Sequence, residues 1–121
     1  MANILIVEDE EAINQLIKQN LRLAGHECTQ VYDGLAAKQI LQGQQSFDLI
    51  LMDVMLPHID GFTLMQYVKE IPVIFLTGKN DRESVMKVTA LRPEGYLLKS
   101  MEAEQIIKAI DDFFEKKKWT I

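Results

Sequence analysis

The chain has 121 residues and a net charge of −5, from 13 Lys and Arg against 18 Asp and Glu. Hydrophobic residues make up 48% and charged residues 26%, a balance typical of a globular domain and too apolar for a disordered segment. We therefore predict one domain over residues 1–121. A domain of this size buries about two thirds of the surface of its unfolded chain, so it needs no disulfide or structural metal to fold.

The composition also argues against several classes of partner. An acidic chain binds nucleic acid poorly, because DNA affinity depends on Lys and Arg that neutralise phosphates. The longest apolar runs span about five residues, far short of the roughly 20 that a membrane helix needs. The first residues lack the basic and apolar stretches of a signal peptide. We expect a cytoplasmic domain with no direct contact to nucleic acid or membrane.

Five short runs predict β-strands. The first, third and fourth runs are continuously apolar, as expected for strands that are covered on both faces. A turn or a helical pattern follows each of them. The predicted ranges are Asn3–Val7, Glu27–Val31, Asp48–Met52, Pro72–Thr77 and Gly95–Lys99.

Stretches with helical spacing follow the strands. The first is expected to end at Gly25, because glycine adopts positive φ at low cost. The others are expected over 34–42, from about 61, over 81–90 and over 101–117. Asp60 is expected to cap the third. In the first stretch the predicted apolar face carries Ile13, Leu16, Ile17 and Leu21. The predicted polar face carries Asn14, Lys18 and Arg22.

Alternation of five strands with five helices predicts an α/β fold with a parallel sheet and helices on both faces. The expected architecture is the flavodoxin-like, doubly wound, five-stranded sheet with strand order 2-1-3-4-5. In such sheets ligands bind beyond the carboxyl ends of the strands. The side chains at those ends therefore indicate the function.

Polar side chains gather at the predicted carboxyl ends. Glu8 and Asp9 follow the first strand, Asp53 follows the third, Thr77 ends the fourth and Lys99 ends the fifth. Each has an ordinary explanation alone, such as a turn former or a solvated lysine. Their coincidence at one edge of the sheet favours a common site.

The charges of these groups indicate the chemistry. Crowded carboxylates repel, so at least one pKa should rise unless a cation is present, and a hard divalent ion such as Mg²⁺ would relieve the conflict. A phosphoryl group could then be held by the metal, Lys99 and Thr77, with Asp53 as the nucleophile. Glu10 and Glu11 are interpreted as residues that cap the following helix and complement its dipole.

Four segments carry a resemblance to a known family. They lie at the ends of the predicted strands, in the expected order, and together they are specific. The segments are Ile6–Glu10, Leu51–Pro57 with Asp60–Gly61, Leu76–Gly78 and Gly95–Lys99. The chain resembles the receiver domains of bacterial two-component response regulators over essentially its whole length.

The resemblance implies a role for each matching residue. Asp53 would accept a phosphoryl group from the phosphohistidine of a histidine kinase or phosphotransfer protein, and Thr77 and Lys99 would contact that group. Asp9 and Asp53 would bind Mg²⁺ (or Mn²⁺) directly, Glu8 would bind it directly or through water, and the backbone carbonyl of Met55 would complete the protein ligands. Thr77 and Tyr96 would form the switch. The residues that would carry these roles are Glu8, Asp9, Asp53, Met55, Thr77, Tyr96 and Lys99.

The resemblance also implies partners and an output. The switch would alter the surface formed by helix 4, strand 5 and helix 5, where an output domain or a second receiver would dock. The domain would promote its own phosphorylation and dephosphorylation without turning over a separate substrate, so we expect no enzyme. The chain carries no DNA-binding segment, which leaves open a stand-alone regulator or a part of a longer protein.

One residue and two segments depart from the family's pattern. Ser100 stands where proline is usual after the lysine, which puts a cis peptide there in doubt because a non-proline cis bond costs about 2.5–4 kcal/mol. The short connection before Pro72 predicts a short third helix. The turn over 91–94 also differs from the usual one.

Three other functions are weaker matches. A haloacid-dehalogenase-like phosphatase needs a second Asp two residues after its nucleophile, where this chain has Met55. An FMN carrier needs a phosphate-binding loop after the first strand, where Glu8 to Glu11 would repel phosphate. A receiver-like interaction module that is never phosphorylated stays the main alternative.

Overall fold

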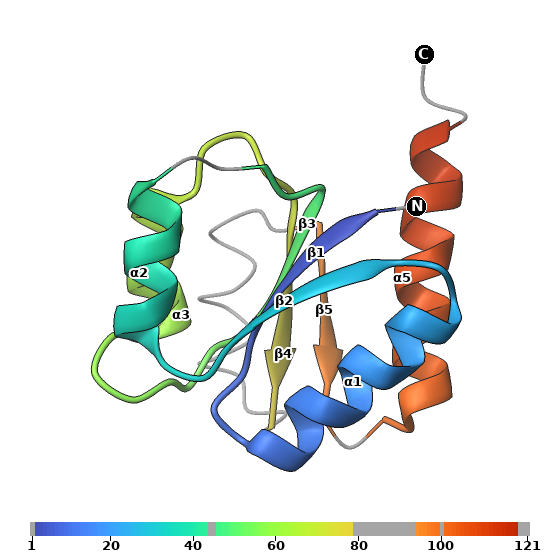
Figure 1. Cartoon of the computed structure of the whole chain (residues 1–121), viewed down its shortest axis with the longest axis horizontal. Helices are drawn as coiled ribbons and strands as arrows, with labels where there is room; N and C mark the ends of the chain where they lie inside the picture. Colours follow the sequence, from blue (N-terminus) through green and yellow to red (C-terminus); the bar gives the residue numbers. More distant parts are fainter. Residues whose placement is uncertain (1, 44–45, 79–93, 100, 119–121) are drawn as a thin grey trace.

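The computed structural model describes residues 2–43, 46–78, 94–99 and 101–118. In the described part of the chain up to β4, strands and helices alternate, as predicted (Figure 1). The strands are β1 (Asn3–Val7), β2 (Glu27–Val31), β3 (Leu49–Asp53), β4 (Val73–Thr77) and β5 (Gly95–Leu98). The helices are α1 (Glu11–Leu23), α2 (Gly34–Gln42), α3 (Gly61–Leu64) with a 3₁₀ turn η1 (Met65–Tyr67), and α5 (Ala103–Lys118).

All neighbouring strands pair in parallel, in the order β2-β1-β3-β4-β5. This confirms the predicted sheet. The third helix is short, as predicted, and the helix predicted over 81–90 lies outside the described residues, as do Ser100 and the turn residues 91–93. Within the described part of the chain, no helix is both long enough and apolar enough to cross a membrane.

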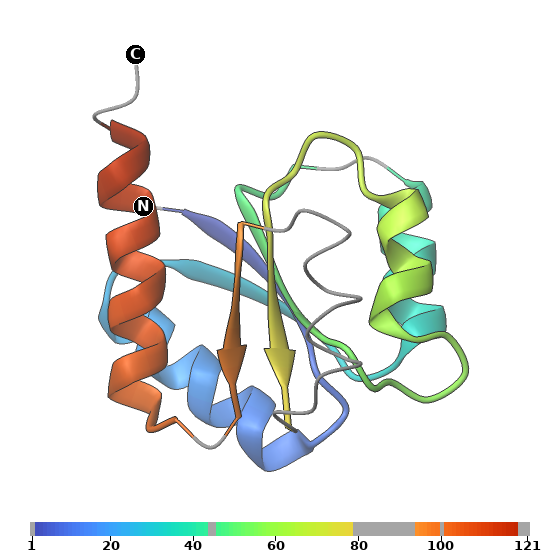
Figure 2. The same cartoon turned by 180° about the vertical axis from the view of Figure 1, so that it is seen from behind.

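Helices cover both faces of the sheet. Helices α2 and α3 lie on one face and α1 and α5 on the other, and the view from behind shows the same two layers (Figures 1 and 2). Each central strand sends alternate side chains into two separate cores. In β1, Leu5 and Val7 belong to the core under α2 and α3, whereas Ile4 and Ile6 belong to the core under α1 and α5. This two-sided burial explains the continuous apolar runs.

Local signals begin and end the helices, and those predicted at Asp60 and Gly25 are confirmed. Asp33 caps α2 by accepting a hydrogen bond from the Ala36 backbone N–H at 2.7 Å. Asp60 accepts one from the Thr63 backbone N–H at 2.8 Å and caps α3. After α1, Gly25 adopts a φ of +93°, a conformation that glycine reaches without a steric penalty.

The predicted faces of α1 are wrong at two positions. Leu16, assigned to the apolar face, is 49% exposed, whereas Asn14, assigned to the polar face, is fully buried. The helical spacing explains this result, because Asn14, Ile17 and Leu21 lie three and four residues apart and share one side of the helix. Leu16 lies about 200° around the helix axis from Asn14.

Candidate functional site

Three carboxylates meet at the carboxyl end of the sheet. Glu8 and Asp9 follow β1, and Asp53 is the last residue of β3. The two strands are neighbours, with Val7 opposite Met52, so the residues that follow come together. One carboxylate oxygen from each of Glu8, Asp9 and Asp53 lies within 4.8 Å of the other two. The structure therefore brings together the three acids that the sequence singled out.

Two of these carboxylates are removed from water. Glu8 is 0% exposed and Asp53 is 1% exposed, whereas Asp9 is exposed. Burial raises the pKa of Glu8 to about 7, with a smaller contribution from the charge of Asp53. Burial also raises the pKa of Asp53 above its ordinary value. The predicted rise is confirmed, but its main cause is desolvation rather than repulsion.

Lys99 follows β5 and reaches past the end of β4 to the acids. Its Nζ lies 2.6 Å from Asp53 Oδ2 and 2.8 Å from Glu8 Oε1. Burial alone would lower the pKa of Lys99, but its close contacts with the carboxylates outweigh burial and hold the pKa above the ordinary value. Lys99 therefore carries its positive charge directly into the pocket, as predicted.

Glu10 also contacts this lysine, and its interpretation as a helix cap is wrong. Glu10 stands at the N-cap position of α1, but its side chain makes no capping hydrogen bond. Its Oε1 lies 3.0 Å from Lys99 Nζ instead, and its backbone N–H donates to Glu8 Oε2 at 2.9 Å. Glu11 lies in the first turn of α1, as expected for a residue that complements the helix dipole.

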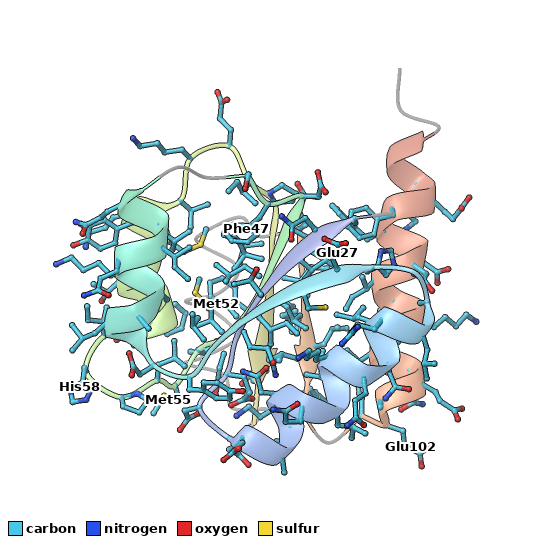
Figure 3. All side chains as sticks on the ribbon, in the orientation of Figure 1. Glu27, Phe47, Met52, Met55, His58 and Glu102 are labelled. Carbon is cyan, nitrogen blue, oxygen red and sulfur yellow. The ribbon has the colours of Figure 1, made fainter. Side chains whose placement is uncertain are left out.

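Thr77 and Met55 lie beside the acids. Thr77 ends β4, is 5% exposed and comes one residue after Leu76, the partner of Asp53 in the strand register. The Met55 backbone N–H donates to Asp53 Oδ1 at 3.0 Å. Figure 3 shows Met55 on the loop that leaves the lower end of the sheet, where its side chain is 73% exposed. Thr77 thus lies at the same edge of the sheet as Asp53, and Met55 bonds the Asp53 carboxylate through its backbone.

Tyr96 lies apart from the acids. It stands opposite Phe75 in the pairing of β4 and β5 and is 46% exposed. With Ala109 and Phe113 it lines a groove of about 440 Å³ beside α5. Its inward rotation, which the resemblance implied, stays a prediction.

Asn14 is a site neighbour that the sequence interpretation missed. Its side-chain amide donates to the backbone carbonyl of Glu8 at 3.0 Å. The spacing of Asn14 from Ile17 and Leu21 favours the buried face of the helix, whereas the polarity of its side chain favours exposure.

The donor set fits a hard divalent cation. Among the described residues, Glu8 Oε1 and Asp53 Oδ2 are buried without a hydrogen-bond partner, and each contacts Lys99 at ion-pair distance. Carboxylate oxygens at this separation are ligands that Mg²⁺ prefers. The pocket thus offers oxygen ligands whose charge is only partly balanced by the lysine.

The sequence profile of the response regulator receiver domain matches residues 4–111. The chain belongs to the response regulator receiver domain family. This receiver domain is 34% identical over 116 residues to the "DNA-binding dual master transcriptional regulator RpaA" of a Synechocystis strain, covering 91% of this chain and 48% of that protein. It is 33% identical over 117 residues to the "transcriptional regulatory protein PcoR" of Escherichia coli, covering 91% of this chain and 50% of PcoR.

The receiver domain spans about half the length of the curated relatives that it matches. Among solved structures, it resembles the receiver domain of a signal transduction histidine kinase from Syntrophus aciditrophicus, with a TM-score of 0.85 and 27% identity over 100% of this chain and 96% of that chain. The BeF₃-activated DrrB receiver domain gives a TM-score of 0.82 and 26% identity, covering 95% of this chain and 98% of that one. This domain is therefore a receiver of the two-component type in both sequence and fold.

Proposed function

We propose that this receiver accepts a phosphoryl group on Asp53 from the phosphohistidine of a histidine kinase or phosphotransfer protein. The observation that carries the proposal is the position of the Asp53 carboxylate. It is 1% exposed at the end of a central strand, 2.6 Å from a lysine and within 4.8 Å of two further acids. A nucleophilic carboxylate in this setting has nearby groups to neutralise an incoming phosphoryl group.

Glu8, Asp9 and Asp53 would hold Mg²⁺ (or Mn²⁺), with the Met55 carbonyl as a further oxygen ligand. The buried oxygens of Glu8 and Asp53, whose negative charge Lys99 balances only in part, support this assignment. The bound ion supplies positive charge that offsets repulsion between the carboxylates and the phosphoryl oxygens. Side chains of the receiver do the remaining work of the transfer.

In the transfer step, an Asp53 carboxylate oxygen forms a bond to phosphorus while the bond from phosphorus to the donor's imidazole nitrogen breaks. The electron pair of the broken bond returns to the imidazole. Lys99 exchanges its contact with the free Asp53 carboxylate for one with a phosphoryl oxygen, and Thr77 donates to another. Both contacts need a phosphoryl group on Asp53. Phosphorylation would therefore shift the population towards the conformation in which Thr77 and Lys99 reach the phosphoryl oxygens.

The output would be carried by the surface around β5 and α5. The Lys99 backbone N–H donates to the Thr77 carbonyl at 2.9 Å, so a movement of Thr77 is transmitted to β5. Tyr96 lies on that strand and would turn inward as the phosphoryl group draws Thr77 away. This change would expose or reshape a docking surface for an output domain or a second receiver.

Several finer expectations belong to the same proposal. The chain would act as one receiver domain that turns over no separate substrate and touches no nucleic acid itself. The cytoplasm stays its predicted compartment. RpaA is named as a DNA-binding regulator, and by analogy the phosphorylated receiver would control a DNA-binding partner rather than bind DNA.

The test is incubation with Mg²⁺ and acetyl phosphate, followed by intact-protein mass spectrometry. The wild-type chain should gain the mass of one phosphoryl group. Asp53→Asn and a wild-type sample in EDTA should gain nothing, because they lack the nucleophile or the cation. Circular dichroism of Asp53→Asn checks that its fold is unchanged. Modification that persists in Asp53→Asn would contradict the proposal, as would an unmodified wild-type chain.

A further inference from the structure

Asn14 is a fully buried polar residue in the second turn of α1. It is 0% exposed, on the helix side that otherwise carries Ile17 and Leu21 into the core. Asparagine is a weak helix former, because its side chain competes for backbone hydrogen bonds. Burying its amide is also costly unless every polar atom is bonded. Specific contacts must therefore offset both the low helix propensity of Asn14 and the cost of burying its amide.

Those contacts use the whole amide. The two Nδ2 hydrogens are donated to the Glu8 carbonyl at 3.0 Å and the Val31 carbonyl at 3.1 Å. Oδ1 accepts a hydrogen bond from Gln30 Nε2 at 2.9 Å. Glu8 directly follows β1, and Val31 ends β2. One side chain therefore joins α1 to the carboxyl ends of two neighbouring strands.

The contacts converge on the backbone of Glu8. Its carbonyl accepts from Asn14, and its own N–H donates to the Val31 carbonyl at 3.2 Å. The peptide groups on both sides of the Glu8 Cα are thus held by groups outside β1. The second of these peptide groups also contains the backbone nitrogen of Asp9. Rotation of the backbone at Glu8 would therefore move the side chains of Glu8 and Asp9 relative to Asp53.

We infer that Asn14 is a positioning residue for the cation-binding acids, which sets the orientation of Glu8 and Asp9 towards Asp53 and thereby the affinity for a divalent ion. The inference rests on the proposed function, because it assumes that these acids bind the ion. Residues that orient metal ligands through hydrogen bonds typically change metal affinity about 10–100-fold when replaced. Leucine at position 14 would keep the number and branching of the side-chain heavy atoms and favour the helix, but it would leave the Glu8 carbonyl without the Asn14 donor.

The test compares Asn14→Leu with Asn20→Leu. Asn20 is a matched control on the same helix, since its Nδ2 donates to the Leu16 carbonyl at 2.8 Å, away from the acids. Isothermal titration calorimetry with Mg²⁺ alone gives the Kd of each folded variant, and urea denaturation in EDTA gives the stability. Asn14→Leu should weaken Mg²⁺ binding about 10–100-fold, whereas Asn20→Leu should leave the Kd at the wild-type value.

A second variant covers the case in which Asn14→Leu does not fold. Gln30 is half-buried, and Gln30→Met removes the donor to Asn14 Oδ1 while keeping the apolar stem. It should weaken Mg²⁺ binding by a smaller factor than Asn14→Leu, because Gln30 contacts Asn14 and not the acids themselves. An unchanged Kd in the folded variants, even with lower stability, would overturn the inference and leave the proposed function standing. A wild-type chain that binds no Mg²⁺ would overturn both.

Discussion

Lys99 Nζ lies 2.6 Å from Asp53 Oδ2, the shortest of its contacts with the surrounding acids. The same ammonium contacts Glu8, so one lysine partly neutralises the two buried carboxylates of the pocket. A divalent ion bound by these acids would act on the same negative charge. Before phosphorylation, the lysine and the ion are therefore expected to compete for the carboxylate oxygens. Once Asp53 carries a phosphoryl group, both are expected to neutralise the phosphoryl oxygens.

Replacing Lys99 with Met should strengthen Mg²⁺ binding. The substitution removes a positive charge near the ion and frees the carboxylate oxygens, and we expect Kd to fall about tenfold, equivalent to about 1.4 kcal/mol. Phosphorylation by acetyl phosphate should become about 10²–10³-fold slower, because a preorganised contact to the phosphoryl group is lost. Calorimetric titration and a mass-spectrometric time course measure the two effects.

Lys108→Met is the control for this charge change, because Lys108 is exposed on α5. It removes one positive charge without touching the pocket, and it should leave both the Mg²⁺ affinity and the phosphorylation rate near their wild-type values. Weaker Mg²⁺ binding in Lys99→Met would show that the lysine supports the ion rather than competing with it.

The stability of the metal-free domain should fall as pH rises from about 4.5 to 7. Burial raises the pKa of Glu8 from 4.5 to about 7, so in this window the folded chain holds a proton that the unfolded chain has released. The free energy of unfolding therefore decreases with pH, by at most about 3 kcal/mol from this group. Urea denaturation in EDTA across this range measures the slope.

Glu8→Gln removes this titration and should flatten the pH dependence while it weakens Mg²⁺ binding. Added Mg²⁺ should restore stability mainly at the upper end of the window, because the ion binds the deprotonated carboxylate. A metal-free wild-type chain whose stability rises steadily between these pH values would contradict the assigned direction of the Glu8 shift.

Gly61→Ala should disturb the backbone of Asp53. A Cβ built on Gly61 would lie 2.5 Å from the Asp53 carbonyl oxygen and 3.1 Å from Val54 Cα. The resulting overpacking should cost about 1–3 kcal/mol of stability and slow phosphorylation. Gly95→Ala is the control, since a Cβ there meets nothing within 4 Å and should change stability by less than about 0.5 kcal/mol. Equal effects of the two substitutions in urea denaturation would refute this explanation.

The His26 side chain should stabilise the end of the sheet opposite the acids. Its Nδ1 accepts from the Ala2 backbone N–H at 3.3 Å, so Nε2 carries the proton and donates to Asp111 Oδ1 at 2.9 Å on α5. His26→Leu keeps the packing against Phe114 but loses both bonds, and should lower the free energy of unfolding by about 1–2 kcal/mol. Asp112→Asn, on the exposed neighbour of Asp111, should have no such effect.

Much of the fold could be predicted because local and global signals agree. Each continuous apolar run supplies side chains to two cores, as Leu5 and Ile6 do in β1, and such a run is typical of a strand in a sheet that is covered on both faces. Capping residues such as Asp60 also act through short-range contacts that a sequence pattern reveals. The convergence of Glu8 and Asp53 then follows from parallel strands that end at one edge.

Other details depend on three-dimensional contacts that residue type alone does not reveal. The polarity of Asn14 predicts exposure, and its burial becomes favourable only through hydrogen bonds to the carbonyls of Glu8 and Val31. Glu10 resembles a helix-capping residue by position, but Lys99 arrives from a strand 89 residues away along the chain. The reach of that lysine follows from the strand order, not from local sequence.

The most direct test of the account is chemical trapping of the phosphorylated residue. Borohydride reduces an aspartyl phosphate to homoserine, which peptide mass spectrometry locates in the sequence. After treatment with Mg²⁺ and acetyl phosphate, homoserine should appear at position 53 alone, and EDTA should abolish it. Homoserine at position 9, or its absence from the treated wild-type chain, would contradict the claim that Asp53 is the phosphoryl acceptor.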